Sequence, residues 1–484
     1  MDAYFIMSTD NLGNKAKKGF IWSAVESFSS QGFQFVFSIL LARLLTPSDF
    51  GVIGMLTIFL ALSESIVDSG FGNALMQKKD RNQLDYSTVF YVNLFISVCL
   101  YVIMFFAAPF IADFYNMPIL VDITRVMSIR FIISGFILVQ VTKLTVDLNF
   151  KKLTKIRVTS TVLSGIIGVI LAYNGFGVWS LVAQSVAAYF FLFVLLWTFS
   201  RWLPSLCFSM ESFRALFRYG SKLLVTGLYG QLFEHINSLI IGKFYSTNLL
   251  GYYTKARSLA QLPSMNITTI LYRVSFPVLC SIQDDDERLA NAINKLIKQT
   301  YFIVFPLMFG LFAVSSPLVD FLLTSKWSGC VPYLRLLCIS MSLLPICGYN
   351  IDLLLVKGHS GTHLKLDIIK KCFTILVLSI TASISVMAIC IGSIFTGLFS
   401  WLLTGYYGSK SVKVTIKDQI KDMLPSFVIS VVMVITIFPI SYLNIGSIII
   451  LIIQIIVGGL VYFVLSRIFN RDSLIEMKSL VKRN

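Results

Sequence analysis

The chain has 484 residues, of which 56% are hydrophobic and only 13% are charged, and its mean hydropathy is +0.80. Soluble domains carry about 25% charged residues, so this composition excludes a soluble protein and places most of the chain in lipid. A formal net charge of +16 would suggest a nucleic-acid partner in a soluble protein, so the positions of the charges decide what it means here.

Fourteen stretches are apolar enough, at roughly 20 residues each, to cross the ~30 Å hydrocarbon core as helices. In chain order they are 20–42, 48–70, 86–112, 119–144, 156–174, 177–200, 219–242, 248–274, 296–318, 331–356, 364–386, 388–409, 425–443 and 446–467. Turns that contain Pro or Gly, such as LTPSDFG and YNGFG, separate many of them. The sequence therefore predicts an all-α integral membrane protein with about 14 transmembrane helices.

Basic residues gather in every second connection between these stretches. If the N-terminus is cytoplasmic, the inner segments hold most of the 40 Lys and Arg residues, and the outer loops hold only Arg43, Lys243 and Lys326. This alternation is the positive-inside pattern. We therefore expect both termini to be cytoplasmic, and we interpret the basic balance as topology, with no nucleic acid as a partner.

Two pairs of similar stretches indicate an internal duplication. SILLARLLTPSDFG (Ser38–Gly51) resembles SLIIGKFYSTNLLG (Ser238–Gly251), and AAPFIADF near residue 110 resembles SSPLVDF near residue 318. Each pair is six predicted helices apart, so both copies have the same orientation, as in transporters built from parallel repeats. The expected domains are a six-helix lobe at 1–205, a second six-helix lobe at 206–410, and two further helices with a basic cytoplasmic tail at 411–484.

No motif for chemistry in a soluble domain is present. The outer loops are short, and the chain lacks a Walker A loop, HExxH and GxSxG. Its eight cysteines are scattered without CxxC spacing, and three histidines do not complete a metal site. We expect no catalytic residue, no metal and no cofactor, and a protein that moves its substrate rather than an enzyme.

Charged residues within the predicted spans are the candidate functional residues, because a charge at the membrane centre costs about 2.5–3.5 kcal/mol and usually faces a wet cavity or a partner. Arg130 lies near the midplane of its span, and Lys255 and Arg257 lie about 10–14 Å from the outer face. For the residues nearer a span end, snorkelling to the interface is the alternative. The candidate substrate-binding residues are Arg130, Lys255, Arg257, Arg125, Arg273 and Arg335.

Three acidic residues also lie within spans: Glu26, Glu64 and Glu234. They could pair with cavity cations or carry a coupling proton, and pairing is the simpler interpretation. Because basic residues outnumber acidic ones deep in the spans, the pattern favours an anionic cargo.

Several stretches resemble the lipid-linked oligosaccharide flippases of the Wzx type, in the branch of polysaccharide and lipopolysaccharide export proteins. They are LLARLLTPSDFGVIGM, GFGNALMQKKD, LNFKKLTKI, GFGVWSLVAQSVA, LLGYYTKARSLAQLP and FPLMFGL. These flippases belong to the multidrug/oligosaccharidyl-lipid/polysaccharide exporter superfamily. The resemblance runs from about residue 15 to about 410 and more loosely to the end.

The resemblance implies a multi-pass protein of the bacterial inner membrane with two six-helix lobes around a central basic cavity. It implies translocation of an undecaprenyl-diphosphate-linked sugar repeat unit to the outer leaflet by alternating access, for the synthesis of a surface polysaccharide such as O-antigen or capsule. Other polysaccharide assembly proteins are candidate partners. It supplies no ligand motif, so the binding role of the basic residues is inferred from this sequence alone.

Three alternatives stay open. A cation-coupled multidrug antiporter of the same superfamily would have a cavity governed by deep carboxylates, and Glu64 and Glu234 fit that description. A lipid II flippase for peptidoglycan is close in function, but the stretches quoted above fit the export branch better. A polysaccharide polymerase acting on the same lipid-linked substrate should carry a large outer loop, which this chain lacks.

Overall fold

The computed structural model describes residues 2–68, 70–200, 202–412, 414–443, 445–471 and 473–475, with side chains described outside 2–21, 24 and 265–274. Over this part of the chain, regular structure is helical and no strand occurs. Helices satisfy all of their backbone hydrogen bonds internally, which lipid requires of a spanning segment. The prediction of an all-α protein is therefore confirmed.

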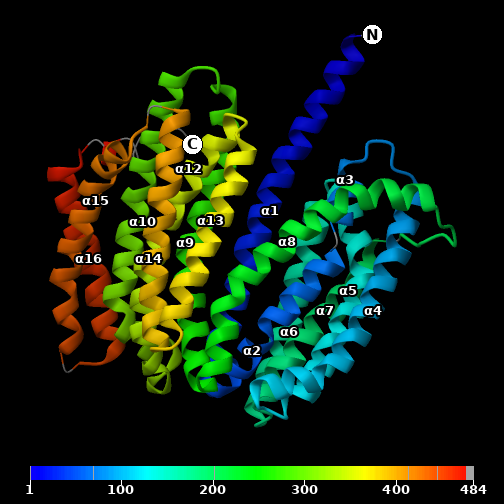
Figure 1. Ribbon diagram of the computed structural model, residues 1–484, viewed down its shortest axis with the longest axis horizontal. Helices are drawn as coiled ribbons and strands as arrows, with labels where there is room; N and C mark the ends of the chain where they lie inside the picture. The colour runs from blue at the N-terminus through cyan, green and yellow to red at the C-terminus, as the bar shows by residue number, and fades with distance from the viewer. Residues whose placement is uncertain are drawn as a thin grey trace. The chain divides into compact units, whose positions relative to one another are not determined.

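The chain divides into two compact units, Met1–Gly251 and Tyr252–Asn484. The helices of the first unit, coloured from blue to green in Figure 1, are α1 (Asp2–Leu44), α2 (Pro47–Asp68), α3 (Phe71–Gln77), α4 (Gln83–Tyr115), α5 (Leu120–Val146), α6 (Phe150–Tyr173), α7 (Val178–Ser200) and α8 (Met210–Phe244). Helix α9 (Thr247–Ser281) begins in this unit and continues in the second. Within the first unit, α4 packs along α5, α6 lies between α1 and α7, and α8 packs along α2.

The second unit is built on α10, which packs against α11, α15 and α16. Its elements after α9 are α10 (Asp286–Leu323), a 3-10 helix (Ser325–Cys330), α11 (Val331–Ser342), α12 (Leu344–Val356), α13 (Ser360–Thr381), α14 (Val386–Ser411), α15 (Ile416–Ile437), a second 3-10 helix (Phe438–Tyr442) and α16 (Ser447–Phe469). Buried apolar residues on α10, such as Ile293, Ile297 and Tyr301, form a core together with residues of α12 and α15.

Every predicted span coincides with a helix or a pair of consecutive helices. Among the described residues, ten segments are long and apolar enough to cross a membrane. The other four predicted spans lie on α1, α8, α9 and α13, and the count of fourteen, the orientation of the termini and the lobe boundaries stay predictions. The span expected at 331–356 is two helices that meet at Leu343, because Pro345 in the first turn of α12 has no N–H to continue the hydrogen-bond ladder of α11.

The two copies of the duplicated stretch contact each other at the first turns of α2 and α9. A Cβ placed on Gly51 would lie 1.9 Å from the carbonyl oxygen of Thr247, and one on Gly251 would lie 1.9 Å from the carbonyl oxygen of Pro47. The hydroxyls of Ser48 and Thr247 are 2.8 Å apart. Pro47 and Gly51 correspond to Thr247 and Gly251 in the repeat, so the contact is reciprocal, and it requires glycine on both sides.

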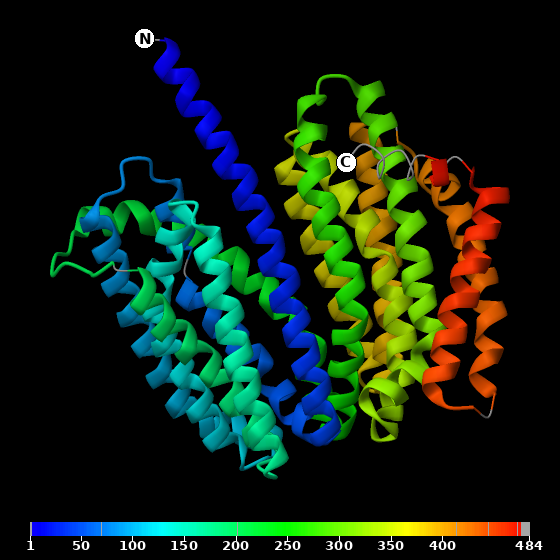
Figure 2. The same cartoon turned by 180° about the vertical axis from the view of Figure 1, so that it is seen from behind.

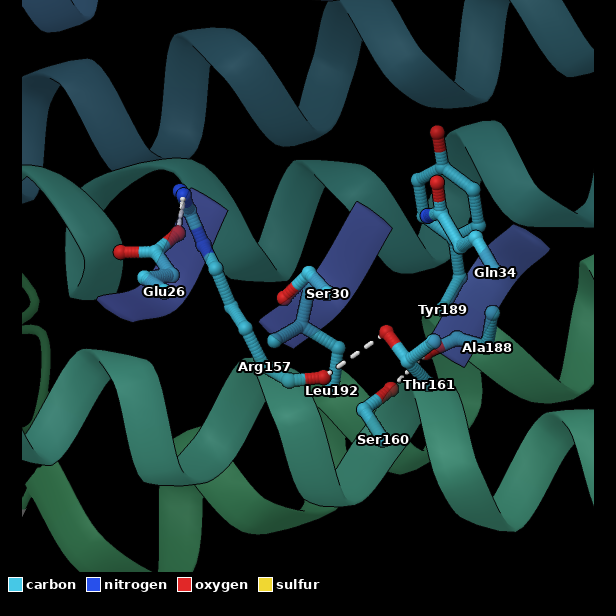
Figure 3. A pocket seen from close by; sticks show the side chains of 9 residues that line it. All are labelled: Glu26, Ser30, Gln34, Arg157, Ser160, Thr161, Ala188, Tyr189 and Leu192. Carbon is cyan, nitrogen blue, oxygen red and sulfur yellow. Dashed lines mark hydrogen bonds and ion pairs between the residues drawn. The ribbon is translucent and has the colours of Figure 1, made fainter. Parts of the chain in front are cut away.

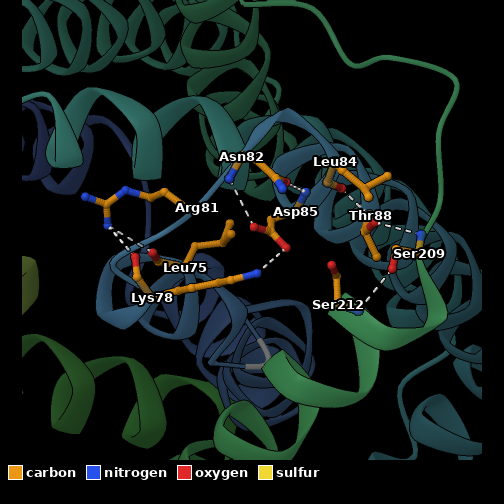
Figure 4. A network of polar contacts seen from close by, with 9 residues as sticks. All are labelled: Leu75, Lys78, Arg81, Asn82, Leu84, Asp85, Thr88, Ser209 and Ser212. Atoms are coloured by element: carbon orange, nitrogen blue, oxygen red, sulfur yellow. Dashed lines mark hydrogen bonds and ion pairs between the residues drawn. The ribbon is translucent and has the colours of Figure 1, made fainter.

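A buried ion pair closes the connection between α3 and α4 (Figure 4). The Asp85 carboxylate accepts from Lys78 Nζ at 2.6 Å and from the Asn82 backbone N–H at 3.0 Å, and its side chain is 0% exposed. Asn82 caps α4 in return by accepting from the Asp85 N–H. Arg81 donates to the carbonyl of Leu75 at the end of α3. Each of these charged groups therefore has a local structural partner.

The connection from α7 to α8 is fixed on α4, next to the α3–α4 connection (Figure 2). Gln83 donates to the Leu203 carbonyl at 2.8 Å and accepts from Trp202 Nε1 at 2.7 Å. The hydroxyls of Ser87 and Ser205 are 2.9 Å apart. The starting position of α8 is thus determined by hydrogen bonds to α4.

Candidate functional site

Three helices of the first unit place a charged cluster among the predicted spans. Arg130 of α5 pairs with Glu64 of α2, with Nη2 and Oε1 2.8 Å apart. The hydroxyl of Tyr189 on α7 donates to the same Oε1 at 2.5 Å, and Arg130 Nη1 donates to Ser185 Oγ at 3.1 Å. The Arg130 side chain is 11% exposed and that of Glu64 is 32% exposed, so the carboxylate is the more accessible partner.

Arg130 is therefore not a free cation. Its Nε is buried and has no hydrogen-bond partner among the described residues. Its guanidinium also lies 5.6 Å from the ring centre of Tyr189, within cation–π range. The Arg130 guanidinium uses one edge for Glu64 and keeps Nε as a spare hydrogen-bond donor. It can therefore bind a second anionic ligand, or exchange Glu64 for one.

Glu64 faces a cavity of about 430 Å³ within the first unit. Asp68, Asn73, Thr142, Thr145 and Gln231 are among the other residues that line it, from α2, α3, α5 and α8. The described lining contains both polar and apolar residues, with two carboxylates but no Lys, Arg or His. Arg130 thus reaches this cavity only through its partner Glu64.

A second cavity of about 280 Å³ lies among α1, α6 and α7 (Figure 3). At one end Glu26 Oε1 pairs with Arg157 Nη1 at 2.5 Å, and Tyr189 and Gln34 lie at the other end. Ser30 Oγ is buried there without a described hydrogen-bond partner. Because Tyr189 lines this cavity and also bonds to Glu64, it joins the polar groups of the two cavities.

Arg125 and Arg335 lie against aromatic rings rather than beside carboxylates. The guanidinium carbon of Arg125 is 4.3 Å from the ring centre of Phe105. That of Arg335 is 4.9 Å from the ring centre of Phe438, and its Nε donates to Ser315 Oγ at 2.9 Å. Each of these contacts lies within one unit. The predicted role of Arg125 and Arg335 in substrate binding stays a prediction.

Lys255 and Arg257 differ in burial, as expected for residues two positions apart on one helix. Lys255 is 4% exposed, and its Nζ lies 5.8 Å from the ring centre of Trp327, whereas Arg257 is half-buried.

Arg273 lies outside the described side chains. Glu234 on α8 is exposed. The structure brings together Arg130 and Glu64 of the predicted set, and pairs Glu26 with a residue that was not predicted.

Sequence reasoning missed Arg157, Tyr189 and Ser185. Arg157 stands at the start of the predicted span 156–174 and counts among the cytoplasmic basic residues of the positive-inside pattern, but α6 begins at Phe150, which places Arg157 in the third turn of that helix opposite Glu26. A signal was available, because Glu26 in an apolar span needs a nearby cation. Tyr189 and Ser185 lie in an apolar helix whose sequence does not distinguish them from residues that face lipid.

In the second unit, a cavity of about 250 Å³ lies among α11, α12, α13 and α14. Hydroxyl side chains and the pair of Lys370 and Asp367, 3.2 Å apart, contribute to its lining. None of the predicted binding residues is part of its described lining. The candidate site is therefore the cluster around Arg130 in the first unit.

Residues 40–332, more than half of the chain, match the family described as "Polysaccharide biosynthesis protein". The chain belongs to this family. Two similar proteins are the lipopolysaccharide biosynthesis protein WzxC of Escherichia coli, 27% identical over 74% of each chain, and the teichuronic acid biosynthesis protein TuaB of Bacillus subtilis, 27% identical over 70% of this chain and 71% of TuaB. The predicted membership of the polysaccharide export branch is confirmed.

Solved structures of other membrane transporters have the same fold as this chain. The lipid II flippase MurJ in its inward closed conformation has a TM-score of 0.77 at 17% identity, covering 94% of this chain and all of that chain. An inward-facing multidrug resistance transporter of the MATE family and the MOP superfamily has a TM-score of 0.63 at 16% identity, covering 79% of this chain and 95% of that chain. At such identities the likeness concerns the fold alone, so the family member is a multi-pass helical membrane protein with a transporter fold.

Proposed function

We propose that this protein moves an undecaprenyl-diphosphate-linked oligosaccharide repeat unit from the inner to the outer leaflet of the bacterial inner membrane, by alternating access and without a catalytic step. Membership of the polysaccharide biosynthesis family and the transporter fold support this proposal. The observation that carries it is Arg130, a forked cation at the predicted midplane that is held by one partly exposed carboxylate.

A diphosphate cannot cross hydrocarbon alone, because removing its charges from water costs many kcal/mol. Arg130 offers a bidentate partner for phosphate oxygens, and Glu64 occupies it in the absence of cargo. We propose that the diphosphate takes the place of Glu64, which stays hydrogen-bonded to Tyr189. When the phosphate leaves, Glu64 returns to Arg130, so the buried cation is never without a counter-charge and release is not hindered.

An inside-negative membrane potential favours this direction of transport. It contributes ~2.3 kcal/mol per charge per 100 mV to the outward movement of an anion. Glu26 and Glu64 are the candidates for a coupling proton or cation, because each carboxylate borders a cavity of the first unit.

One observation favours a second candidate, a cation-coupled multidrug antiporter. The cavity at Glu64 and Asp68 contains no basic residue in its described lining, so it suits a cationic ligand. Under the flippase proposal the same carboxylates serve the coupling ion instead. The two functions differ in what accumulates in the cell when the protein is absent.

The test is deletion of the gene in its host, followed by mass spectrometry of the extracted undecaprenyl-linked intermediates. We expect one finished repeat unit to accumulate, and expect complementation with the wild type to remove it. Arg130→Ala should leave the intermediate in place, and Arg130→Lys should restore transport partly, because lysine keeps the charge but loses the fork.

Arg288→Ala is the matched control, because Arg288 is exposed and its ion-pair partner among the described residues is Asp285, three residues away. It should restore transport fully at equal protein levels. Full rescue by Arg130→Ala would keep the flippase and remove Arg130 from the path of the cargo. No accumulation in the deletion strain, together with altered sensitivity to cationic drugs, would contradict the flippase and favour the antiporter.

A further inference from the structure

Three basic residues form a stripe on the exposed face of α8. Arg214, Arg218 and Lys222 are spaced four residues apart, which places them on one side of the helix over about 12 Å. All three are exposed. The positive-inside pattern counts all three with the cytoplasmic residues at or before the start of the predicted span 219–242, but α8 already begins at Met210, so they belong to a single helix.

These three side chains have no ion-pair partner among the described residues. Other basic residues at the predicted cytoplasmic ends of helices are committed to one: Lys78 pairs with Asp85, and Lys357 pairs with Asp286. The positive-inside pattern requires cations on this side, but it requires neither their alignment nor the absence of counter-charges. The stripe therefore needs an explanation beyond topology.

The opposite face of α8 holds the stripe in position. Leu216 is 4% exposed, and the rings of Phe213 and Phe217 stack with centres 5.4 Å apart and contact Phe71 of α3. Ser209 caps the helix by accepting from the Ser212 N–H. Because this face is packed and the helix start is capped, the three cations project from a fixed support.

Further along α8, the face that carries the stripe becomes apolar. Val225 is 64% exposed and Leu232 is 39% exposed, and the helical period places both beside the line of the three cations. One helix face thus offers cations in its first turns and apolar side chains in its later turns. This order suits an amphiphile with an anionic head and a hydrocarbon chain.

We propose that the stripe of Arg214, Arg218 and Lys222 is where the diphosphate head of the lipid-linked substrate first docks in the inner leaflet. This inference rests on the proposed function and adds the position at which the substrate arrives. Neighbouring cations are one helical turn apart, close enough for both phosphates of one diphosphate to contact two of them. The head can then pass from one cation to the next along α8.

The test measures binding of radiolabelled farnesyl diphosphate to the purified full chain in nanodiscs of phosphatidylcholine. The variant Arg214→Gln, Arg218→Gln, Lys222→Gln should weaken binding about tenfold or more, because each such cation near a membrane is worth roughly a fivefold change in affinity. The control Arg288→Gln, Lys417→Gln, Lys421→Gln removes the same charge from exposed positions in the second unit and should change binding less than about twofold. Thermal unfolding of each variant establishes that it is folded.

Equal binding by the stripe variant and the wild type, or equal losses in both triple variants, would overturn the docking proposal. So would displacement of the probe by phosphatidylglycerol in the nanodisc, because the stripe would then recognise any anionic lipid. Displacement by farnesyl diphosphate but not by farnesyl monophosphate supports it. The deletion assay tests the flippase function and does not involve α8. A negative binding result would therefore reject the docking proposal alone, whereas a negative deletion result would reject the proposed function.

Discussion

At the scale of single residues, four of the charged residues within the predicted spans form two ion pairs. Glu64 with Arg130 and Glu26 with Arg157 each join a carboxylate of α1 or α2 to a guanidinium of α5 or α6. Pairing lowers the cost of burial, but a half-buried pair adds little net stability, so its presence points to a role other than stability. We propose that in the pair of Arg130 and Glu64 this role is exchange of the carboxylate for a phosphate.

Stability and transport can be separated at the pair of Glu64 and Arg130. Glu64→Leu alone should lower the free energy of unfolding by about 1–3 kcal/mol, because it leaves the Arg130 charge uncompensated. The double variant Glu64→Leu, Arg130→Leu should recover most of that loss and still fail to export polysaccharide. Thermal unfolding in detergent and quantification of the surface polysaccharide measure the two effects. Normal export by the double variant would show that the pair is structural only.

At the scale of helices, the contact between the first turns of α2 and α9 leaves no room for a side chain. Adding one methyl group at Gly51 or Gly251 places a carbon 1.9 Å from a backbone carbonyl oxygen, which a rotamer change cannot relieve. Both copies of the duplicated stretch therefore have glycine at this position because a side chain would not fit. The first turns of the two helices approach as closely as their backbones allow.

Alanine substitutions test this contact. Gly51→Ala and Gly251→Ala should each lower the melting temperature and reduce export, because the first turns of α2 and α9 must separate. Gly230→Ala in α8 is the control: its added methyl has no atom within 4 Å, and alanine is favoured over glycine in a helix by about 0.5–1 kcal/mol. If all three variants melt at or above the wild-type temperature, the close approach is not required for folding.

At the scale of the whole molecule, the number of spans decides on which side of the membrane each connection lies. The charge pattern predicts fourteen, whereas ten described segments are long and apolar enough by composition. The four predicted spans that are not among these ten segments include those on α8 and α9, which carry Glu234, Lys255 and Arg257. With a cytoplasmic N-terminus, a connection lies outside if an odd number of spans precedes it, so the side of the connection after α9 depends on whether α1, α8 and α9 span.

Labelling on both sides of α9 distinguishes the two counts: both place the α8–α9 turn outside, but fourteen spans place the α9–α10 connection inside and ten place it outside. Ser246→Cys, at an exposed position of this turn, should react in intact cells with a maleimide that cannot cross the inner membrane, after the outer membrane is permeabilised. The wild type provides the background, because its exposed Cys207 lies in a predicted cytoplasmic connection. Asp284→Cys, in the α9–α10 connection, should react only after lysis. Labelling at position 284 before lysis, or its absence at position 246, would rule out the predicted topology.

The sequence alone determined the class of this protein and most of its helices. Runs of roughly 20 apolar residues can satisfy their backbone in lipid only as helices, so composition and periodicity predict the elements without any tertiary information. The stretches that resemble polysaccharide exporters likewise predict the family, which residues 40–332 confirm. Helix ends were less predictable: α8 begins nine residues earlier than expected, because its first turns carry charge and are not apolar.

Only the tertiary structure decided which charges meet. Glu64 and Arg130 lie on different helices, and Tyr189 joins them from a third, so no spacing along the chain encodes the cluster. The same holds for Glu26 and Arg157, and for the reciprocal contact of Gly51 with Thr247. A hydropathy pattern reports how far a residue lies along its helix, whereas the rotation and packing of that helix determine which neighbour its side chain contacts.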